Sequence, residues 1–169
     1  AVYLEDVRVP ITDTIGDIGR GFQQQMAQFQ DERLIALLSA NAGSLQLWKQ
    51  TVAYGRDRSV FGKPVTKFQF NQFRLVDLMM RIHAARELGY HCVRKRCRGE
   101  DATLEISMGK IFCIEVAQQV ATVCMQLRGG TGYMKETVTG RAFVDTRLAS
   151  IGGGADKVMM QVISRMLGL

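Results

Sequence analysis

Metal-ligand patterns and long apolar runs are both missing from this chain of 169 residues. Its two histidines, His83 and His91, have no ligand partners at the spacing of a metal site. No apolar run reaches the ~18 residues that are needed to span a bilayer. We therefore expect neither a metal centre nor a membrane span.

Disulfide bonds are not indicated either. The four cysteines form no Cys-x-x-Cys motif and stand at Cys92, Cys97, Cys113 and Cys124. Residues 1–10 contain acidic residues in an alternating pattern, unlike a secretory signal. We expect reduced thiols in a cytosolic or organellar protein.

Acidic residues are the minority among the charges. The 22 lysines and arginines against 16 aspartates and glutamates give a formal net charge of +6. Much of this excess lies in RKRCR, residues 94–98, at the end of a helical pattern. Cations are favoured at a helix C-terminus by its dipole, and a cluster without interleaved aromatic residues is weak ground for nucleic-acid binding. We therefore expect no nucleic-acid partner. The other functional interpretation of the cluster is a binding site for a phosphate-rich cofactor.

Apolar helical periodicity is what the chain has in abundance. Hydrophobic residues make up 47% of it, and they recur at helical spacing over about 22–55, 73–98 and 101–127, followed by a short helix and a final one from about residue 155. Residues 2–10 show a strand pattern that ends at Pro10, and Asp101 is placed to cap the third helix. The sequence predicts an all-α fold, an up-and-down four-helix bundle over 21–169 with a short extra helix, preceded by a strand and linker over 1–20. Methionines at helical spacing are expected to fill the core.

Three consecutive glycines, Gly152 to Gly154, stand just before the last helix. Glycine loses more conformational freedom on folding than any other residue, so three in a row need a reason. One interpretation is a ligand held close to the backbone at a helix N-terminus. The other is an ordinary loop between helices, and the run alone favours that one.

Three motifs, taken together, are more specific than the glycine run. FGKPVTKFQ (61–69), QLRGGTGY (126–133) and FVDTRLASIGGGADKV (143–158) occur in the order and spacing of one family. On these motifs the chain resembles the C-terminal helical domain of the acyl-CoA dehydrogenases, over essentially all of residues 1–169. LEDVRVP (4–10) and GRGF (19–22) resemble the last strand of that family's middle β domain and its link to the bundle. The family's N-terminal helical domain and most of its β domain have no counterpart, so we expect a piece of a longer protein.

The resemblance implies a function. Family members bind FAD, oxidise an acyl-CoA thioester to the trans-2-enoyl-CoA and pass the electrons to an electron-transfer flavoprotein. They are homodimers or homotetramers of the bacterial cytoplasm or the mitochondrial matrix. The reaction needs a base over the α-carbon, donors to the thioester oxygen and a flavin fixed opposite the base. We expect this activity of the complete enzyme, and an inactive chain when residues 1–169 stand alone.

The resemblance also implies where the base lies. Many members have a glutamate base in the turn where this chain has Gly153, whose N–H can still donate to the thioester oxygen. Long-chain and isovaleryl members carry the base on the first bundle helix, in a Glu-Arg-Leu context that Glu32 matches here. Phe29, one helical turn earlier, is apolar, so we expect Glu32 to border an apolar pocket while Asp31 faces elsewhere. Arg33 matches the family's arginine beside the substrate.

A set of flavin contacts follows from the same resemblance. Arg58 and Phe61 match residues that reach the FAD of the neighbouring subunit, the arginine by pairing with the pyrophosphate. The other positions that match flavin-binding residues are Phe68, Gln69, Gln126, Gly129, Gly130, Gly154, Ala155, Asp156 and Lys157. Ala155 lacks the hydroxyl of the family's threonine, and Lys157 reverses the charge of its glutamate.

Other functions stay open at this stage. An oxidase-type relative would pass the electrons to oxygen instead. A non-catalytic helical scaffold that only oligomerises is favoured by Ala155 and Lys157, whereas Glu32 and Arg58 favour the enzyme. A nucleic-acid-binding branch of the family is suggested by the basic cluster alone.

Overall fold

Three long helices form the body of the computed structural model, which covers residues 1–169. They are α1 (Gly21–Asp57), α2 (Gln69–Cys97) and α3 (Thr103–Arg128). Three shorter helices follow, α4 (Gly130–Tyr133), α5 (Val138–Ala149) and α6 (Asp156–Met166), and single 3₁₀ turns lie at Ile11–Asp13 and Val65–Lys67. The all-α fold class is confirmed. None of the helices combines the length and the apolar character that crossing a bilayer requires.

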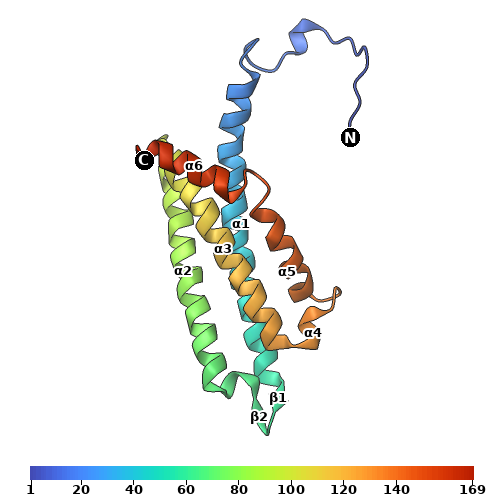
Figure 1. Cartoon of the computed structure of the whole chain (residues 1–169), viewed down its shortest axis with the longest axis vertical. Helices are drawn as coiled ribbons and strands as arrows, with labels where there is room; N and C mark the ends of the chain where they lie inside the picture. The colour runs from blue at the N-terminus through green and yellow to red at the C-terminus, as the bar shows by residue number, and fades with distance from the viewer.

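Helix α3 lies at the centre of the bundle. Helices α1, α2 and α3 run alternately up and down, α5 lies alongside α3, and α6 lies across one end of the bundle (Figure 1). Every other helix contacts α3. The sequence of α3 suits this place, because Ile106, Val116 and Val120 along it are all but fully buried. The glycine turn between α5 and α6 is thereby placed against α1 and α3.

The core is built from aliphatic residues of the three long helices. Leu37 of α1, Ile82 of α2 and Ile106 of α3 are 0%, 1% and 0% exposed. The expectation that methionines fill this core is wrong for most of them, because Met159 alone of the nine is buried.

The N-terminal strand expected over residues 2–10 does not form. Residues 1–10 have no regular secondary structure and are exposed throughout, and Figure 1 shows them extended away from the bundle. A strand is stabilised by hydrogen bonds to a neighbouring strand, and no neighbour lies beside this segment. The alternating pattern is therefore present without the partner that would make it a strand.

A small hairpin joins α1 to α2, in a segment that the sequence presented only as a connector. Strands β1 (Ser59–Val60) and β2 (Lys63–Pro64) pair antiparallel. The two residues between them, Phe61 and Gly62, have φ of +50° and +80°. Positive φ at both positions is the geometry of a tight two-residue hairpin turn. The side chain of Phe61 is left 96% exposed at its tip.

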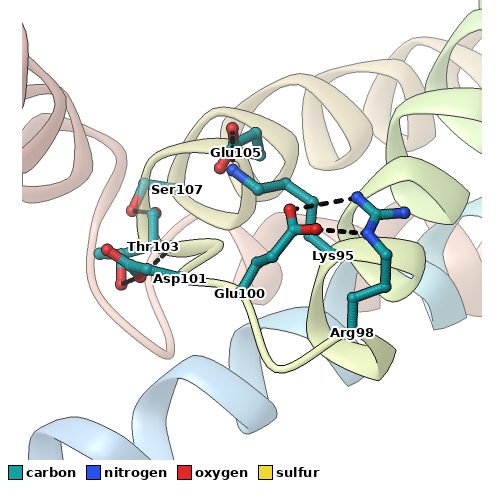
Figure 2. A network of polar contacts seen from close by, with 7 residues as sticks. All are labelled: Lys95, Arg98, Glu100, Asp101, Thr103, Glu105 and Ser107. Atoms are coloured by element: carbon teal, nitrogen blue, oxygen red, sulfur yellow. Dashed lines mark hydrogen bonds and ion pairs between the residues drawn. The ribbon is translucent and has the colours of Figure 1, made fainter.

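Ion pairs at the turn between α2 and α3 involve most of the basic cluster. Lys95 Nζ lies 2.7 Å from Glu105 Oε1, and Arg98 pairs with Glu100 (Figure 2). Arg96 extends to α1, where its Nη2 lies 2.6 Å from Asp31 Oδ1. Three of the four cations in residues 94–98 thus face a carboxylate of the same chain.

The N-cap of α3 is Ala102 and not Asp101 as expected, but the carboxylate of Asp101 still bonds to the first residue of the helix. The Oδ1 atom of Asp101 accepts hydrogen bonds from the N–H of Thr103 at 2.9 Å and from its hydroxyl at 2.7 Å (Figure 2). These bonds lower the pKa of Asp101, because they favour the charged carboxylate.

Candidate active site

The glycine turn has a backbone that other residues adopt only with strain. Gly153 and Gly154 have φ of +65° and +104°, both in the left-handed region. At Gly154 a Cβ atom would also lie 2.7 Å from Met159 Cε and 3.3 Å from Arg33 Nη2. The turn therefore needs glycine for its conformation at two positions and for close packing at one of them.

Two buried cations bind successive carbonyl groups of this turn. Arg33 Nε donates to the carbonyl oxygen of Gly153 at 2.7 Å, and Lys110 Nζ donates to that of Gly154, also at 2.7 Å. Lys110 Nζ also lies 3.3 Å from Asp156 Oδ1. Arg33 is 8% exposed and Lys110 1% exposed, and burial lowers the pKa of Arg33 while the neighbouring Glu32 opposes that shift.

The turn forms one wall of a small cleft. The cleft has a volume of about 240 Å³ and lies between α1, α3 and α5. It is lined by Glu32, Arg33, Ala36, Lys110, Asp145, Leu148, Ala149, Gly152 and Gly153. The structure thus brings together the two residues predicted to be catalytic, Glu32 and Gly153, and the residue predicted to contact substrate, Arg33.

Glu32 is close to the turn. A Cβ atom at Gly153 would lie 4.0 Å from Glu32 Oε1. The Glu32 side chain is exposed and has no hydrogen-bond or ion-pair partner, whereas Asp31 points to α2 and pairs with Arg96. A carboxylate without a partner beside a cleft is available to accept a proton.

The expectation that Phe29 forms the apolar surroundings of Glu32 is wrong. Phe29 does not line the cleft, and its ring lies 5.6 Å from the guanidinium carbon of Arg33 instead. This contact is a cation–π arrangement. The apolar wall near Glu32 is formed by Ala36, Leu148 and Ala149.

Backbone donors at the centre of the turn are free. The N–H of Gly152 donates to Leu148 O at 2.9 Å and that of Asp156 to Ser150 O at 3.3 Å, while the N–H groups of Gly153 and Gly154 donate to no group of the chain. A carboxylate can create negative charge on a substrate oxygen by removing a proton from the substrate. Free N–H groups beside it can stabilise that charge by hydrogen bonding.

Seven of the predicted flavin residues lie at the other end of the bundle. Arg58 and Phe61 belong to the hairpin region, Phe68 and Gln69 to the start of α2, and Gln126, Gly129 and Gly130 to the junction of α3 and α4. Figure 1 shows this end opposite the turn between α5 and α6. From Glu32 to Asp57, α1 rises about 38 Å at ~1.5 Å per residue. One chain therefore does not bring the two groups together.

This second group suits a dinucleotide. Arg58 is exposed and has no ion-pair partner, which leaves its guanidinium available for phosphate. Gly129 has φ of +60° with no atom within 4 Å of where a Cβ would lie, so a ligand can approach its backbone. Gln126 borders a separate cleft of about 420 Å³ between α2 and α3. The chemistry of these residues fits FAD.

At the start of α6, the predicted flavin residues have mixed surroundings. Asp156 is engaged by Lys110, and Lys157 is exposed. Lys110 and Asp145 are the cleft residues that sequence reasoning missed. A signal for Lys110 was present, because it follows Ile106 and precedes Ile114 by one helical turn, and these two are buried.

Comparison with known proteins assigns the chain to a family. Residues 19–168 match the family described as acyl-CoA dehydrogenase, C-terminal domain. The fold defines an all-α helical bundle domain, and the chain belongs to the acyl-CoA dehydrogenase C-terminal domain family.

Individual relatives are consistent with the family. The chain is 34% identical over 167 residues to a probable acyl-CoA dehydrogenase of Bacillus subtilis, covering 98% of this chain and 44% of the relative. It is 33% identical over 164 residues to the mitochondrial long-chain specific acyl-CoA dehydrogenase of Sus scrofa, covering 97% and 38%. An acyl-CoA dehydrogenase structure from Geobacillus kaustophilus superposes with a TM-score of 0.95 at 33% identity, covering 99% and 44%. The chain thus spans less than half the length of these relatives.

Proposed function

We propose that this chain provides the base and the thioester-oxygen donors of an FAD-dependent acyl-CoA dehydrogenase. The enzyme would oxidise an acyl-CoA thioester to the trans-2-enoyl-CoA. The single observation that carries the proposal is the placement of the unpaired Glu32 carboxylate next to the glycine turn, 4.0 Å from where a Cβ of residue 153 would lie. A carboxylate and free N–H groups at one cleft are what α-proton abstraction from a thioester requires.

Three residues of the cleft have roles in this proposal. Glu32 accepts the α-proton. The N–H of Gly153 donates a hydrogen bond to the thioester oxygen, which becomes more negative as the proton leaves. Arg33 fixes the turn through the Gly153 carbonyl and lies beside Glu32, so the positive charge at the cleft favours the same change. When FAD is bound, it supplies the hydride acceptor that no side chain of this chain provides.

The position of the base resembles that of the long-chain and isovaleryl members. Glycine at residue 153 and glutamate at residue 32 support this finer assignment, and the relative from Sus scrofa is a long-chain specific enzyme.

The flavin residues at the hairpin end are proposed to act on a second copy. Arg58 and Phe61 lie far from the cleft of their own chain, which supports a role at the FAD of a neighbouring subunit in a homodimer or homotetramer. Phe68, Gln69, Gln126, Gly129 and Gly130 would complete that contact. Gly154, Ala155, Asp156 and Lys157 would contact the flavin on the side of the cleft.

The electron acceptor and the compartment belong to the same proposal. We expect the electrons to go to an electron-transfer flavoprotein. Relatives occur in a bacterium and in mitochondria, and we expect the bacterial cytoplasm or the mitochondrial matrix for this protein.

The test uses the natural gene product that contains this sequence. It is loaded with FAD and mixed without oxygen with a series of straight and branched acyl-CoA thioesters, and the flavin absorbance is followed by stopped flow. Bleaching by at least one thioester is expected. No bleaching by any of them would overturn the proposal and favour the scaffold. Oxygen consumption without an added acceptor would identify the oxidase-type relative.

A further inference from the structure

Lys110 is a buried cation that the mechanism above does not use. Its side chain is 1% exposed and lies among the apolar residues of α3, between Ile106 and Ile114. A charge in such a place is strongly destabilising unless it is paired and hydrogen-bonded. Both partners of its ammonium group, the Gly154 carbonyl and Asp156, belong to the glycine turn and the start of α6.

We propose that Lys110 is a positioning residue of the reaction. From beneath the turn, it fixes the peptide plane after Gly154, and with Arg33 it keeps the N–H of Gly153 directed to the thioester oxygen. This inference rests on the proposed function, because the direction of that N–H matters only if a substrate oxygen binds there.

The three glycines cannot hold the turn in place by themselves. They have no side chains with which to anchor the turn, and each has more backbone freedom to lose than another residue would have. Their order must therefore come from groups outside the turn. Arg33 from α1 and Lys110 from α3 provide it, each with a hydrogen bond of 2.7 Å to one of two successive carbonyl oxygens.

Two fixed carbonyl groups fix two peptide planes. All peptide bonds of the chain are trans, so each N–H points away from the carbonyl oxygen of the preceding residue. Arg33 thereby orients the plane between Gly153 and Gly154, and Lys110 orients the plane between Gly154 and Ala155. The other side of the turn is fixed by the bond of 2.9 Å from the Gly152 N–H to Leu148 O. The N–H of Gly153 lies between these two fixed ends.

Asp156 extends this arrangement to α6. Its carboxylate lies in the first turn of α6, where the helix dipole favours negative charge. Lys110 Nζ reaches it at 3.3 Å while also bonding the Gly154 carbonyl. One ammonium group thus joins the turn, the last helix and the central helix.

The first experiment measures the turn itself, without any reaction. Lys110→Met keeps the length of the side chain and removes the donor, and the Asp156 carboxylate that loses its partner is 37% exposed, so water can solvate it. Lys95→Met is the matched control, because Lys95 also pairs with a carboxylate but at the turn between α2 and α3 (Figure 2). In ¹⁵N relaxation, the amides of residues 153–155 should have order parameters near ~0.85 in the wild type and in Lys95→Met, and below ~0.6 in Lys110→Met. Equal values in all three proteins would overturn the inference, and Lys110→Gln replaces Lys110→Met if the latter does not fold.

The second experiment uses the FAD-loaded gene product. Lys110→Met is expected to lower kcat for flavin reduction by ~10–100-fold with KM changed by less than about 3-fold, since a misdirected oxyanion donor acts on the transition state more than on binding. The carbonyl stretch of bound thioester should shift less from its value in water than it does in the wild type. Lys110→Arg, which keeps a cationic donor, should recover part of kcat. Wild-type kcat and carbonyl shift in Lys110→Met would overturn the inference, whereas a wild-type enzyme that oxidises no thioester would overturn the proposed function and leave the relaxation test to judge Lys110.

Discussion

Oε1 of Glu32 lies 4.0 Å from the point that a Cβ atom of residue 153 would occupy. Glu32 stands on α1 near the start of the chain, and Gly153 lies in the turn before α6 near its end. The fold thus provides two places from which one carboxylate could reach the same cleft. In this chain α1 carries the carboxylate, and the turn carries glycine.

Replacing Glu32 by Gln tests the base directly. The amide keeps the shape and polarity of the side chain but cannot accept the α-proton. A positioned general base contributes about 10²–10⁴-fold, so flavin reduction by acyl-CoA should slow by at least that factor in the FAD-loaded gene product. Flavin content and substrate binding should change little. Anaerobic stopped-flow bleaching of the flavin is the measurement.

The neighbouring acid gives the control. Asp31 pairs with Arg96 on the side of α1 that faces α2, so Asp31→Asn should keep the wild-type rate of bleaching. If Glu32→Gln bleaches as fast as the wild type, Glu32 is not the base, and Asp145, the other carboxylate of the cleft, becomes the candidate.

Adding a glutamate at residue 153 should restore part of the lost rate. In the Glu32→Gln background, Gly153→Glu places a carboxylate over the same cleft. A Cβ there meets Arg33 Cγ at 3.9 Å, which is an ordinary contact. The left-handed φ of +65° is the obstacle, since it is unfavourable by about 1–2 kcal/mol for a residue with a Cβ.

The matched control for this rescue is Gly153→Gln in the same background. It has the same backbone strain and nearly the same volume but no base. Single-turnover rates should rise over Glu32→Gln alone for the glutamate and stay unchanged for the glutamine. Equal rates for the two variants would mean that the turn does not reach the α-carbon.

The sequence predicted the residues of the cleft better than their surroundings. Because residue 153 is glycine and not glutamate, the sequence pointed to Glu32 as the base. The structure places Glu32 beside Gly153. The burial of Arg33 and its bond to the Gly153 carbonyl could not be read from the pattern, because they depend on how α5 and α6 return to α1. Periodicity could have marked Lys110 as buried, but its partners could not be predicted, since they lie more than forty positions further along the chain.

For the fold as well, features that depend on the local sequence were predicted, and features that depend on distant segments were not. The three long helices follow from apolar periodicity, which is a local property. The strand expected over residues 2–10 failed, because a strand also needs a neighbour that no local pattern specifies. The short hairpin at Phe61 and Gly62 was missed, because its strands are only two residues long and leave no alternating pattern.

Cys97 should react with thiol reagents in the folded chain, and the other three cysteines should not. Cys97 is exposed, whereas Cys92, Cys113 and Cys124 are buried. Burial raises the pKa of all three buried thiols, and that of Cys113 to about 11. Since the thiolate is the reactive form, iodoacetamide at pH 8 should add one group to the folded chain and four after unfolding, as measured by intact mass. Cys97→Ser should add none when folded, and a second adduct on the folded wild type would contradict the structure.

Self-association should depend on the outer face of α2. Phe73, Val76 and Met80 are spaced at one face of the helix and are 65%, 57% and 61% exposed. An exposed apolar stripe of this kind marks a contact surface, and we expect it to lie between copies of the chain. Sedimentation at micromolar concentration should show an oligomer for the wild type and weaker association for Phe73→Asp. Phe22→Asp, at a similarly exposed site in the first turn of α1, is the control, and a wild-type monomer would exclude the contact.

Acid should remove the contribution of the Lys95–Glu105 pair to the stability of the fold. The hydrogen bond from Lys95 lowers the pKa of Glu105 below its ordinary value of 4.5. A carboxyl whose folded pKa is depressed stabilises the fold fully above its unfolded pKa, and this stabilisation is lost as the pH falls through the folded pKa. Lys95→Met removes the pair, so its Tm should lie below that of the wild type at pH 7 and approach it as the pH falls below about 4.

Thermal unfolding followed by circular dichroism at pH 7, 5 and 3 measures this difference. Glu105→Gln should reproduce the result from the other side of the pair, because it removes the same carboxylate. Arg81→Met, which breaks the exposed pair with Asp77 at 3.0 Å, should change Tm little at any pH, since exposed pairs contribute little. A difference between Lys95→Met and the wild type that stays constant from pH 7 to pH 3 would show that Lys95 acts through packing of its aliphatic stem, and not through the charge of Glu105.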